Sequence, residues 1–172
     1  MEKQLNSKEI YDGKVIRVSL DDVSLDDGRE AKREVVHHRG GCCIALKGYD
    51  GKYLLTKQYR YAQGEEMVEF CAGKIEEGED VKETILRESV EELGYTVKNL
   101  KYYGFIAPSC GYTTERIHLF QGEADLKVGT HFDEDENITT LYYSLEELEE
   151  MIRQGIIYDA KTIALVYRLT RG

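Results

Sequence analysis

Strand-like segments recur along most of this chain, and they restrict its possible folds more than any other feature. The segments are rich in valine, isoleucine, tyrosine and threonine, and turn sequences such as LDDGRE and GYDGKY lie between them. The Asp-Gly pairs supply the positive φ that a tight turn requires. The predicted strands are KVIRVSLDDVSL, AKREVVHH, GCCIALKG, KYLLTKQYRY, MVEFCAG, YYGFIA, RIHLFQGEAD and ITTLYYS. The pattern predicts a protein built mainly from β-sheet.

Predicted helices are few by comparison. One covers Val81–Leu93, and a second runs from Ser144, where SLEE has the form of a capping box, to a stop near Gly155. A third, short helix is expected over the C-terminal AKTIALVYRL. Because strands and helices do not alternate regularly, we expect an α+β fold with helices flanking a sheet, not a doubly wound array.

Length and charge exclude several classes of protein. The 172 residues are 41% hydrophobic, which suits one domain or one domain with a small appendage. No apolar run is long enough to span a membrane, and MEKQLNSKEIYDGK lacks the apolar core of a signal peptide, so a cytoplasmic protein is expected. The net charge of −10 argues against nonspecific binding to nucleic acid or to anionic membranes.

The cysteines Cys42, Cys43, Cys71 and Cys110 contain no CxxC pair and fit no zinc motif. Three of the four lie in apolar or strand-like surroundings, so we interpret them as small core residues of a protein in a reducing compartment. A catalytic thiol at Cys71 or Cys110 is the alternative.

The predicted helix over residues 81–93 has an irregular amphipathic pattern. At about 100° per residue its apolar face collects six side chains, Val81, Ile85, Leu86, Ser89, Val90 and Leu93. Glu83 and Arg87 project opposite this face as an i,i+4 pair. Glu92, however, falls on the border of the apolar face, with Glu88 one turn before it and Glu91 just outside.

A stripe of carboxylates beside the core has two interpretations. It is either a solvated edge of the helix or a cation site, because carboxylates held together in a partly dry place repel one another unless a cation neutralises them. Oxygen ligands alone select hard ions such as Mg²⁺, Mn²⁺ or Ca²⁺.

The stretch GKIEEGEDVKETILRESVEELGY resembles the Nudix box, GX5EX7REUXEEXGU. Its fixed positions are all matched, from Gly73 and Glu79 through the Arg-Glu and Glu-Glu pairs to Gly94. Ser89 departs from the pattern, which expects an aliphatic residue there, and we expect this to alter packing and not chemistry. Tyr95 is an aromatic variant at the last position.

The resemblance implies a Nudix fold, an α/β/α sandwich around a mixed sheet, here with an N-terminal β-rich extension. Residues 1–38 would form the extension, a possible dimerisation element, and residues 39–172 the catalytic domain. It also implies Mg²⁺-dependent hydrolysis of a nucleoside diphosphate linked to another group, with Mn²⁺ as a possible substitute. Glu88 and Glu92, helped by Glu91, would hold the metals, and Arg87 would pair with Glu79.

Matches outside the box resemble the ADP-ribose pyrophosphatase and nucleotide-sugar branch of the family. They are QYR before VEFCAG, GYTTERIHLF, DEDENI, GIIYDAKT and REVVHH. The branch usually forms homodimers through its N-terminal strands, so a homodimer is expected.

This resemblance also implies roles for single residues. Arg60 would contact phosphate or sugar, Glu69 would belong to the substrate site, the Ala72 carbonyl would be a metal ligand, and Glu115 would lie near the metals. Arg33 and Glu34 match positions that help to hold the nucleobase, often across a dimer. Glu134 or Glu136 would be the general base. Arg60 could instead be a charge on the sheet surface, and the acidic loop could be merely solvated.

Two departures bear on the substrate. The ADP-ribose type of sequence has proline where this chain has Cys71 and Cys110, and a cysteine before AG is also familiar in GDP-mannose and UDP-sugar pyrophosphatases. ADP-ribose is the favoured substrate, with a GDP- or UDP-hexose next. A Nudix-like ligand sensor without catalysis is the alternative class, which the complete box disfavours.

Overall fold

The computed structural model describes residues 1–132 and 137–171, and the chain divides into two compact units. Unit 1 comprises Met1–Gly40 and Ala107–Arg116, and unit 2 comprises Gly41–Ile106 and Ile117–Gly172. The boundary predicted from the sequence lies after residue 38, and the assignment of the segment 107–116 to unit 1 was not predicted.

Unit 1 is built on an antiparallel sheet with the order β1-β2-β3. Its strands are β1 (Lys3–Asp12), β2 (Ile16–Ser24) and β3 (Glu30–His38). The segment 107–116 lies along β3, where the Val36 N–H donates to the Tyr112 carbonyl at 2.8 Å and the Thr114 N–H donates to the Val36 carbonyl at 2.9 Å. Strand β1 was not among the predicted segments, because it is polar and exposed throughout and has no buried alternate face to reveal it.

Unit 2 contains a mixed sheet with the order β10-β5-β4-β9-β8, on which β6 pairs with β5 and β7 with β4. The neighbours β4 and β9 run parallel, and the other pairs are antiparallel. The strands are β4 (Gly41–Lys47), β5 (Tyr53–Arg60), β6 (Glu65–Glu69), β7 (Ala72–Lys74), β8 (Tyr95–Ile106), β9 (Ile117–Lys127) and β10 (Ile138–Tyr143).

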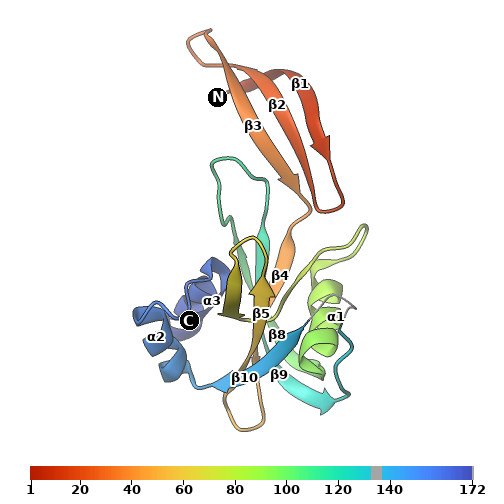
Figure 1. Cartoon of the computed structure of the whole chain (residues 1–172), viewed down its shortest axis with the longest axis vertical. Coiled ribbons are helices and arrows are strands. Elements are labelled where there is room, and N and C mark those ends of the chain that lie inside the picture. Colours follow the sequence, from red (N-terminus) through yellow and green to blue (C-terminus); the bar gives the residue numbers. More distant parts are fainter. Residues whose placement is uncertain (133–136, 172) are drawn as a thin grey trace. The chain divides into compact units, whose positions relative to one another are not determined.

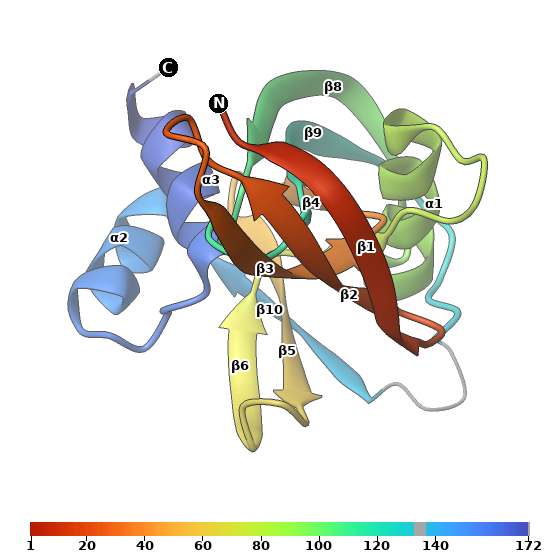
Figure 2. The same cartoon turned by 90° about the horizontal axis from the view of Figure 1, so that it is seen from above.

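Helices cover both faces of this sheet (Figures 1 and 2). They are α1 (Val81–Leu93), α2 (Leu145–Arg153) and α3 (Ala160–Arg171). Helix α1 lies on one face and α2 and α3 on the other, and each face has its own buried core cluster. The predicted α+β class and the α/β/α sandwich around a mixed sheet are confirmed.

The two core clusters are separated by the sheet. Ile85 of α1 belongs to the same cluster as Phe120 of β9. Leu148 of α2 and Leu165 of α3 belong to the other cluster, together with Leu119, the neighbour of Phe120 on β9. Successive residues of β9 therefore face opposite layers, as the pleat of a strand requires.

Strand β8 is longer than the YYGFIA segment that the sequence predicted. It begins at Tyr95, directly after the end of α1, and its pairing with β9 contains three irregularities in register. Each irregularity shifts the alternation of side chains between the two faces of the sheet. Asn99, at one of them, has a positive φ of 53°. The bulges interrupt the alternation of apolar and polar residues by which a strand is predicted from sequence.

The predicted Asp-Gly turns are confirmed: Gly28 and Gly51 have φ values of 84° and 83°. Within the described part of the chain, no helix is both long enough and apolar enough to cross a membrane.

Candidate active site

Helix α1 carries the carboxylate stripe, and its two ends are determined by local sequence. The Asp80 side chain accepts a hydrogen bond from the Lys82 N–H at 2.8 Å, and the Glu83 side chain accepts one from the Asp80 N–H at 3.3 Å. The Asp80 side chain also accepts from the Glu83 backbone N–H, and this bond and the one between the Asp80 N–H and the Glu83 side chain form a complete capping box. Gly94 ends the helix in the left-handed conformation, with its N–H donating to the Val90 carbonyl at 3.0 Å. The predicted bounds of this helix are confirmed.

The buried face of α1 differs from the predicted one. Ile85, Ser89 and Leu93 are buried as expected, but so is Glu92, which is only 4% exposed. Leu86 was predicted to face the core and is 39% exposed, so that prediction is wrong. The helix is rotated so that its carboxylate border, and not the Leu86 border, packs against the sheet.

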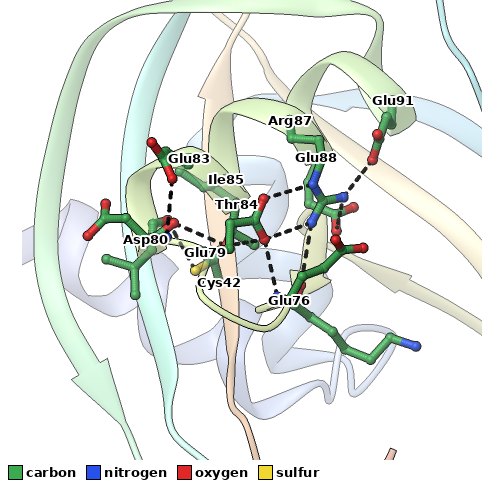
Figure 3. A network of polar contacts seen from close by, with 12 residues as sticks. Cys42, Glu76, Glu79, Asp80, Glu83, Thr84, Ile85, Arg87, Glu88 and Glu91 are labelled. Carbon is green, nitrogen blue, oxygen red and sulfur yellow. Dashed lines mark hydrogen bonds and ion pairs between the residues drawn. The ribbon is translucent and has the colours of Figure 1, made fainter. Parts of the chain in front are cut away.

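Arg87 connects carboxylates of the helix with one from the preceding loop (Figure 3). Its Nε donates to Glu79 Oε1 at 3.0 Å, and its Nη1 donates to Glu88 Oε1 at 2.9 Å and to Glu91 Oε2 at 2.7 Å. The pairing of Arg87 with Glu79 is confirmed. The predicted pairing with Glu83 is wrong, because Glu83 caps the helix instead.

The pKa of Glu79 is lowered to about 2 by this arrangement. The hydrogen bond from Arg87 is the largest cause; it outweighs burial, which raises the pKa, and the Thr84 hydroxyl donates a further bond at 2.8 Å. The pKa of Arg87 is raised above its ordinary value, chiefly by the same bond to Glu79. The connection between loop and helix therefore stays fully charged at neutral pH.

Gly73 of β7 is required by the position of Glu88. A Cβ atom at residue 73 would lie 1.8 Å from Glu88 Cδ, so any other residue here would displace the Glu88 side chain. Gly73 is not among the positive-φ glycines, so space and not backbone conformation excludes other residues here. The close approach of Glu88 gives a physical reason for the glycine that opens the motif.

The three carboxylates of the stripe differ in environment. The side chains of Glu88 and Glu91 are 13% and 38% exposed, whereas Glu92 is buried. Their oxygen atoms suit a hard divalent cation. Among the described residues, however, no three acidic, histidine or cysteine side chains converge as a preformed metal site. Arg87 binds one oxygen of Glu88 and one oxygen of Glu91.

Ser89 and Cys71 lie beneath the stripe. Ser89 is fully buried, and its hydroxyl donates to the Ile85 carbonyl at 2.6 Å, so it packs as predicted with its polar group satisfied. Cys71 is also fully buried, with its Sγ 3.7 Å from the Glu88 carbonyl oxygen. Burial raises the pKa of the Cys71 thiol well above its ordinary value. A catalytic thiol at this position is therefore disfavoured.

The cysteine prediction is confirmed for the core: Cys42, Cys43 and Cys71 are buried, and Cys110 is exposed in unit 1. The pKa of Cys42 is raised to about 12, first by burial and then by the charge of Glu79.

Ala72 follows Cys71 and begins β7, where it pairs in register with Cys43 of β4. The residue is half-buried. The Cys71 carbonyl, one residue earlier, accepts a hydrogen bond from the Ile44 N–H at 3.0 Å. The segment that carries the predicted carbonyl ligand is thus tied to the central strand of the sheet.

Arg60 and Glu69 form a second group of charges. Glu69 is 2% exposed and accepts from Arg60 Nε at 2.6 Å. Its other oxygen accepts from Lys161 Nζ, and Lys161 also pairs with Asp159 Oδ1 at 3.0 Å. Arg60 and Glu69 are predicted site residues, whereas Asp159 and Lys161 are not among the residues predicted from the sequence. The signal was present in GIIYDAKT, a matched segment to which no role was assigned.

Arg33, Glu34 and Glu115 belong to unit 1. Arg33 on β3 pairs with Glu2, with 2.5 Å between Nη2 and Oε1, and Glu34 is exposed on the same strand. Glu115 Oε1 lies 3.7 Å from His38 Nδ1. Their predicted contacts with substrate stay predictions.

Glu134 and Glu136, the predicted alternatives for the general base, lie outside the described residues. His131, which precedes them in the chain, is hydrogen-bonded to the last turn of α1: its N–H donates to the Glu91 carbonyl at 2.9 Å.

Two family models match the chain. The one described as NUDIX domain matches residues 36–166, and the one described as nucleoside diphosphate sugar hydrolase N-terminal domain matches residues 2–36. The second match coincides with most of the strand-rich extension.

Curated relatives resemble nearly the whole chain. A methanol dehydrogenase activator from Bacillus methanolicus is 35% identical over 98% of this chain and 92% of its own. An ADP-ribose pyrophosphatase from Bacillus subtilis is 36% identical, covering 94% and 88%. A GDP-mannose pyrophosphatase from Cronobacter sakazakii is 33% identical, covering 90% and 87%. Among solved structures, an ADP compounds hydrolase superposes with a TM-score of 0.85 at 17% identity, over 99% of this chain and 92% of that one, which supports the fold.

Proposed function

Because the chain belongs to the Nudix hydrolase family, we propose that it hydrolyses the pyrophosphate bond of a nucleoside diphosphate sugar, with ADP-ribose as the favoured substrate. Water adds to one phosphorus atom and the bond from the bridging oxygen to that phosphorus breaks, so that ADP-ribose yields AMP and ribose 5-phosphate. The similarity to an ADP-ribose pyrophosphatase over 94% of the chain supports this choice.

The observation that carries the proposal is the way Arg87 collects carboxylates on the buried border of α1. Arg87 binds Glu79, Glu88 and Glu91, while Gly73 leaves the space that Glu88 occupies. Negative charges held close together at this point repel one another unless positive charge neutralises them. A divalent cation that binds the phosphate groups of the substrate would supply that positive charge.

We infer that Glu88 and Glu92, with Glu91 and the Ala72 carbonyl, hold the metal, and that Mg²⁺ is the natural ion and Mn²⁺ a substitute. Bound divalent ions neutralise phosphate charge and acidify a water molecule. Arg87 keeps Glu88 and Glu91 close in the absence of the ion. The burial of Glu92 limits competition from water for its oxygens.

Arg60 is the residue we propose to contact phosphate or sugar. Its side chain is 37% exposed, and in the described part of the chain its contact with Glu69 uses Nε, which leaves Nη1 and Nη2 for an anion. We propose that Glu69 anchors it, that Arg33 and Glu34 contact the nucleobase, that Glu115 acts near the metals, and that Glu134 or Glu136 is the general base.

A GDP- or UDP-hexose is the second candidate substrate. The observation that favours it is Cys71, which occupies the position before Ala-Gly. The similarity to a GDP-mannose pyrophosphatase supports the same alternative.

A substrate panel tests the proposal. Purified protein with Mg²⁺ is incubated with ADP-ribose, GDP-mannose, UDP-glucose, NADH and diadenosine polyphosphates, and the products are identified. We expect AMP and ribose 5-phosphate from ADP-ribose at the highest kcat/KM. GMP and mannose 1-phosphate at a higher kcat/KM would favour the second candidate. No hydrolysis of any compound would favour a ligand sensor and contradict the enzyme proposal.

The metal proposal has a readout that does not depend on turnover. A ligand that binds only the folded protein adds about 2.7 kcal/mol of stability at 100 times its Kd, which raises Tm by about 5–10 °C in a domain of this size. We expect Mg²⁺ and Mn²⁺ to raise Tm in the wild type and much less in Glu92→Gln. An equal rise in both proteins would exclude Glu92 as a ligand.

We further propose that the protein is a homodimer that uses its N-terminal strands. Light scattering after size exclusion gives the mass directly, and a mass of 19.8 kDa, that of one chain, would contradict the proposal.

A further inference from the structure

Glu69 is a buried acid that shares its charge between two cations. It is 2% exposed, with Oε1 bound to Arg60 and Oε2 bound to Lys161. A buried carboxylate is tolerated only when it is paired and its oxygens are satisfied. Arg60 is partly exposed, whereas Lys161 is 9% exposed. One partner can therefore meet a ligand, and the other is enclosed within the protein.

The enclosed partner is held by the beginning of α3. Asp159 precedes the helix; its Oδ1 pairs with Lys161 at 3.0 Å, and its Oδ2 accepts from the Thr162 N–H at 3.0 Å, as a helix-capping residue does. Burial lowers the pKa of Lys161, but the charges of Glu69 and Asp159 outweigh it, and the pKa stays above its ordinary value. Lys161 is therefore a cation at neutral pH, held between two carboxylates.

The same helix end also holds the segment that follows Glu69. The Thr162 hydroxyl accepts from the Phe70 N–H at 2.9 Å and donates to Asp159 Oδ2 at 2.6 Å. Both Phe70 and Thr162 are fully buried. On the other side, the Thr56 hydroxyl donates to the Glu69 carbonyl at 3.3 Å. The backbone and the side chain of Glu69 thus have defined positions.

We propose that Lys161 is a positioning residue for substrate binding: by occupying one oxygen of Glu69 it limits Arg60 to a single contact and leaves the outer guanidinium nitrogens free for the substrate's phosphate. This inference rests on the proposed function, in which Arg60 contacts phosphate or sugar.

The physical reason lies in the geometry of arginine. A carboxylate with both oxygens free accepts two parallel bonds from a guanidinium, and this bidentate pair is stronger than a single bond. If Lys161 is removed, Glu69 keeps a buried charge with one partner, and Arg60 is drawn into the second contact. One of the two outer nitrogens that should meet the substrate is then consumed within the protein.

The test compares Lys161→Met with a matched control, Lys57→Met. Lys57 lies on the β5–β6 hairpin, which also carries Arg60 and Glu69. It pairs with Glu66 at 2.5 Å, but both side chains are exposed, at 39% and 59%. With ADP-ribose and saturating Mg²⁺, we expect Lys161→Met to raise KM about 10-fold or more, the scale of one charge-assisted hydrogen bond. We expect kcat to stay within about threefold and Lys57→Met to behave as wild type.

Two further variants separate positioning from simple structural support. Lys161→Arg keeps the charge and should retain a KM near the wild-type value. The double variant Glu69→Gln/Lys161→Met removes the charge that captures Arg60, so its KM should return part of the way to wild type. A hole left in the structure by the loss of Lys161 would not be repaired by that second substitution.

Binding of α,β-methylene ADP-ribose, measured by calorimetry, gives a readout without turnover. We expect its affinity to fall in Lys161→Met by the same factor as KM rises. If Lys161→Met does not fold, Lys161→Gln replaces it, with an expected loss of at least about threefold because the amide keeps one hydrogen bond.

A folded Lys161→Met or Lys161→Gln variant with wild-type KM and wild-type analogue affinity would overturn the proposal, as would a loss confined to kcat. The proposed function fails separately, if the wild type hydrolyses no compound of the panel.

Discussion

Two groups of charged residues in unit 2 have similar compositions and different construction. The helix cluster, Glu79, Arg87, Glu88 and Glu91, comes from α1 and the loop before it. The strand cluster, Arg60, Glu69, Asp159 and Lys161, joins β5 and β6 to the start of α3, and Lys161 lies 92 residues from Glu69 in the chain. The first is local in sequence, and the second exists only after folding.

The clusters also differ in how their charges are balanced. In the helix cluster one arginine serves three carboxylates, and Glu92 adds a further acid beside them. In the strand cluster two cations face two carboxylates. The excess negative charge of the first group suits cation binding, and the balance of the second suits a fixed support. Variants of the helix cluster should therefore lower kcat, whereas loss of Lys161 should raise KM.

The largest expected effect is that of Glu92→Gln. The substitution removes a charge from the carboxylate stripe and hardly changes its volume. We expect kcat to fall about 100-fold or more, the scale of losing one group that stabilises charge in the transition state, with circular dichroism unchanged. The control is Glu149→Gln on the exposed side of α2, which should leave kcat unaltered. A near-normal kcat for Glu92→Gln would remove the basis for treating the helix cluster as catalytic.

Gly73→Ala comes next and tests whether space at β7 determines the position of Glu88. The added methyl group would lie 1.8 Å from Glu88 Cδ, so the carboxylate must move. We expect a loss of about 1–3 kcal/mol in stability from overpacking and a fall in kcat of up to about 100-fold from misplacement. Chemical denaturation and steady-state kinetics measure these effects.

The matched control for Gly73→Ala is Gly111→Ala. A Cβ atom at Gly111 meets nothing within 4 Å, so that variant should keep wild-type stability. Equal behaviour of the two variants would show that the contact with Glu88 is unimportant.

The third prediction concerns pH and the pairing of Glu79 with Arg87. A folded-state pKa of about 2, below the unfolded value, means that the ionised Glu79 stabilises the fold above about pH 4.5 and that this stabilisation is lost as pH falls towards 2. Glu79→Gln should therefore lower the free energy of unfolding by about 1–3 kcal/mol at pH 7. Denaturant unfolding of both proteins between pH 7 and pH 3 measures the difference.

That difference should shrink as the solution is acidified. A gap between wild type and Glu79→Gln that stayed constant down to pH 3 would contradict the assigned pKa. Glu83→Gln, which alters a cap and leaves Arg87 intact, is the appropriate comparison.

The smallest expected effect belongs to Ser89→Ala. The hydroxyl donates to the Ile85 carbonyl within the same helix, and the carbonyl keeps its helical bond without it. We expect a change of about 1 kcal/mol or less in stability and an unchanged kcat. A large catalytic loss would mean that the hydroxyl orients a carboxylate and that the packing interpretation is wrong.

Much of the fold could be predicted because its signals are local. The capping residues Asp80 and Ser144 and the left-handed Gly94 are each determined by a few neighbouring residues, and the structure confirms the helices that they delimit. Strand β8 was only partly predicted, because bulges break its alternation.

For the site, the sequence by itself determined the residues of the helix cluster and the adjacent Glu92. Helical periodicity places Glu88, Glu91 and Glu92 on one border of the helix, and the motif adds Glu79 and Arg87. Only the tertiary structure decided how that border packs: packing against the sheet buries Glu92 and leaves Leu86 exposed, and Gly73 leaves space for the Glu88 side chain beside β7.

The ion pair between Lys161 and Glu69 was likewise visible only in the tertiary structure. Nothing in the spacing of two residues 92 positions apart indicates a contact, because the contact is created when α3 packs against the sheet and each buried charge must find a partner. Local patterns report the interactions of neighbours along the chain. The pairing of buried charges from distant segments depends on the whole fold.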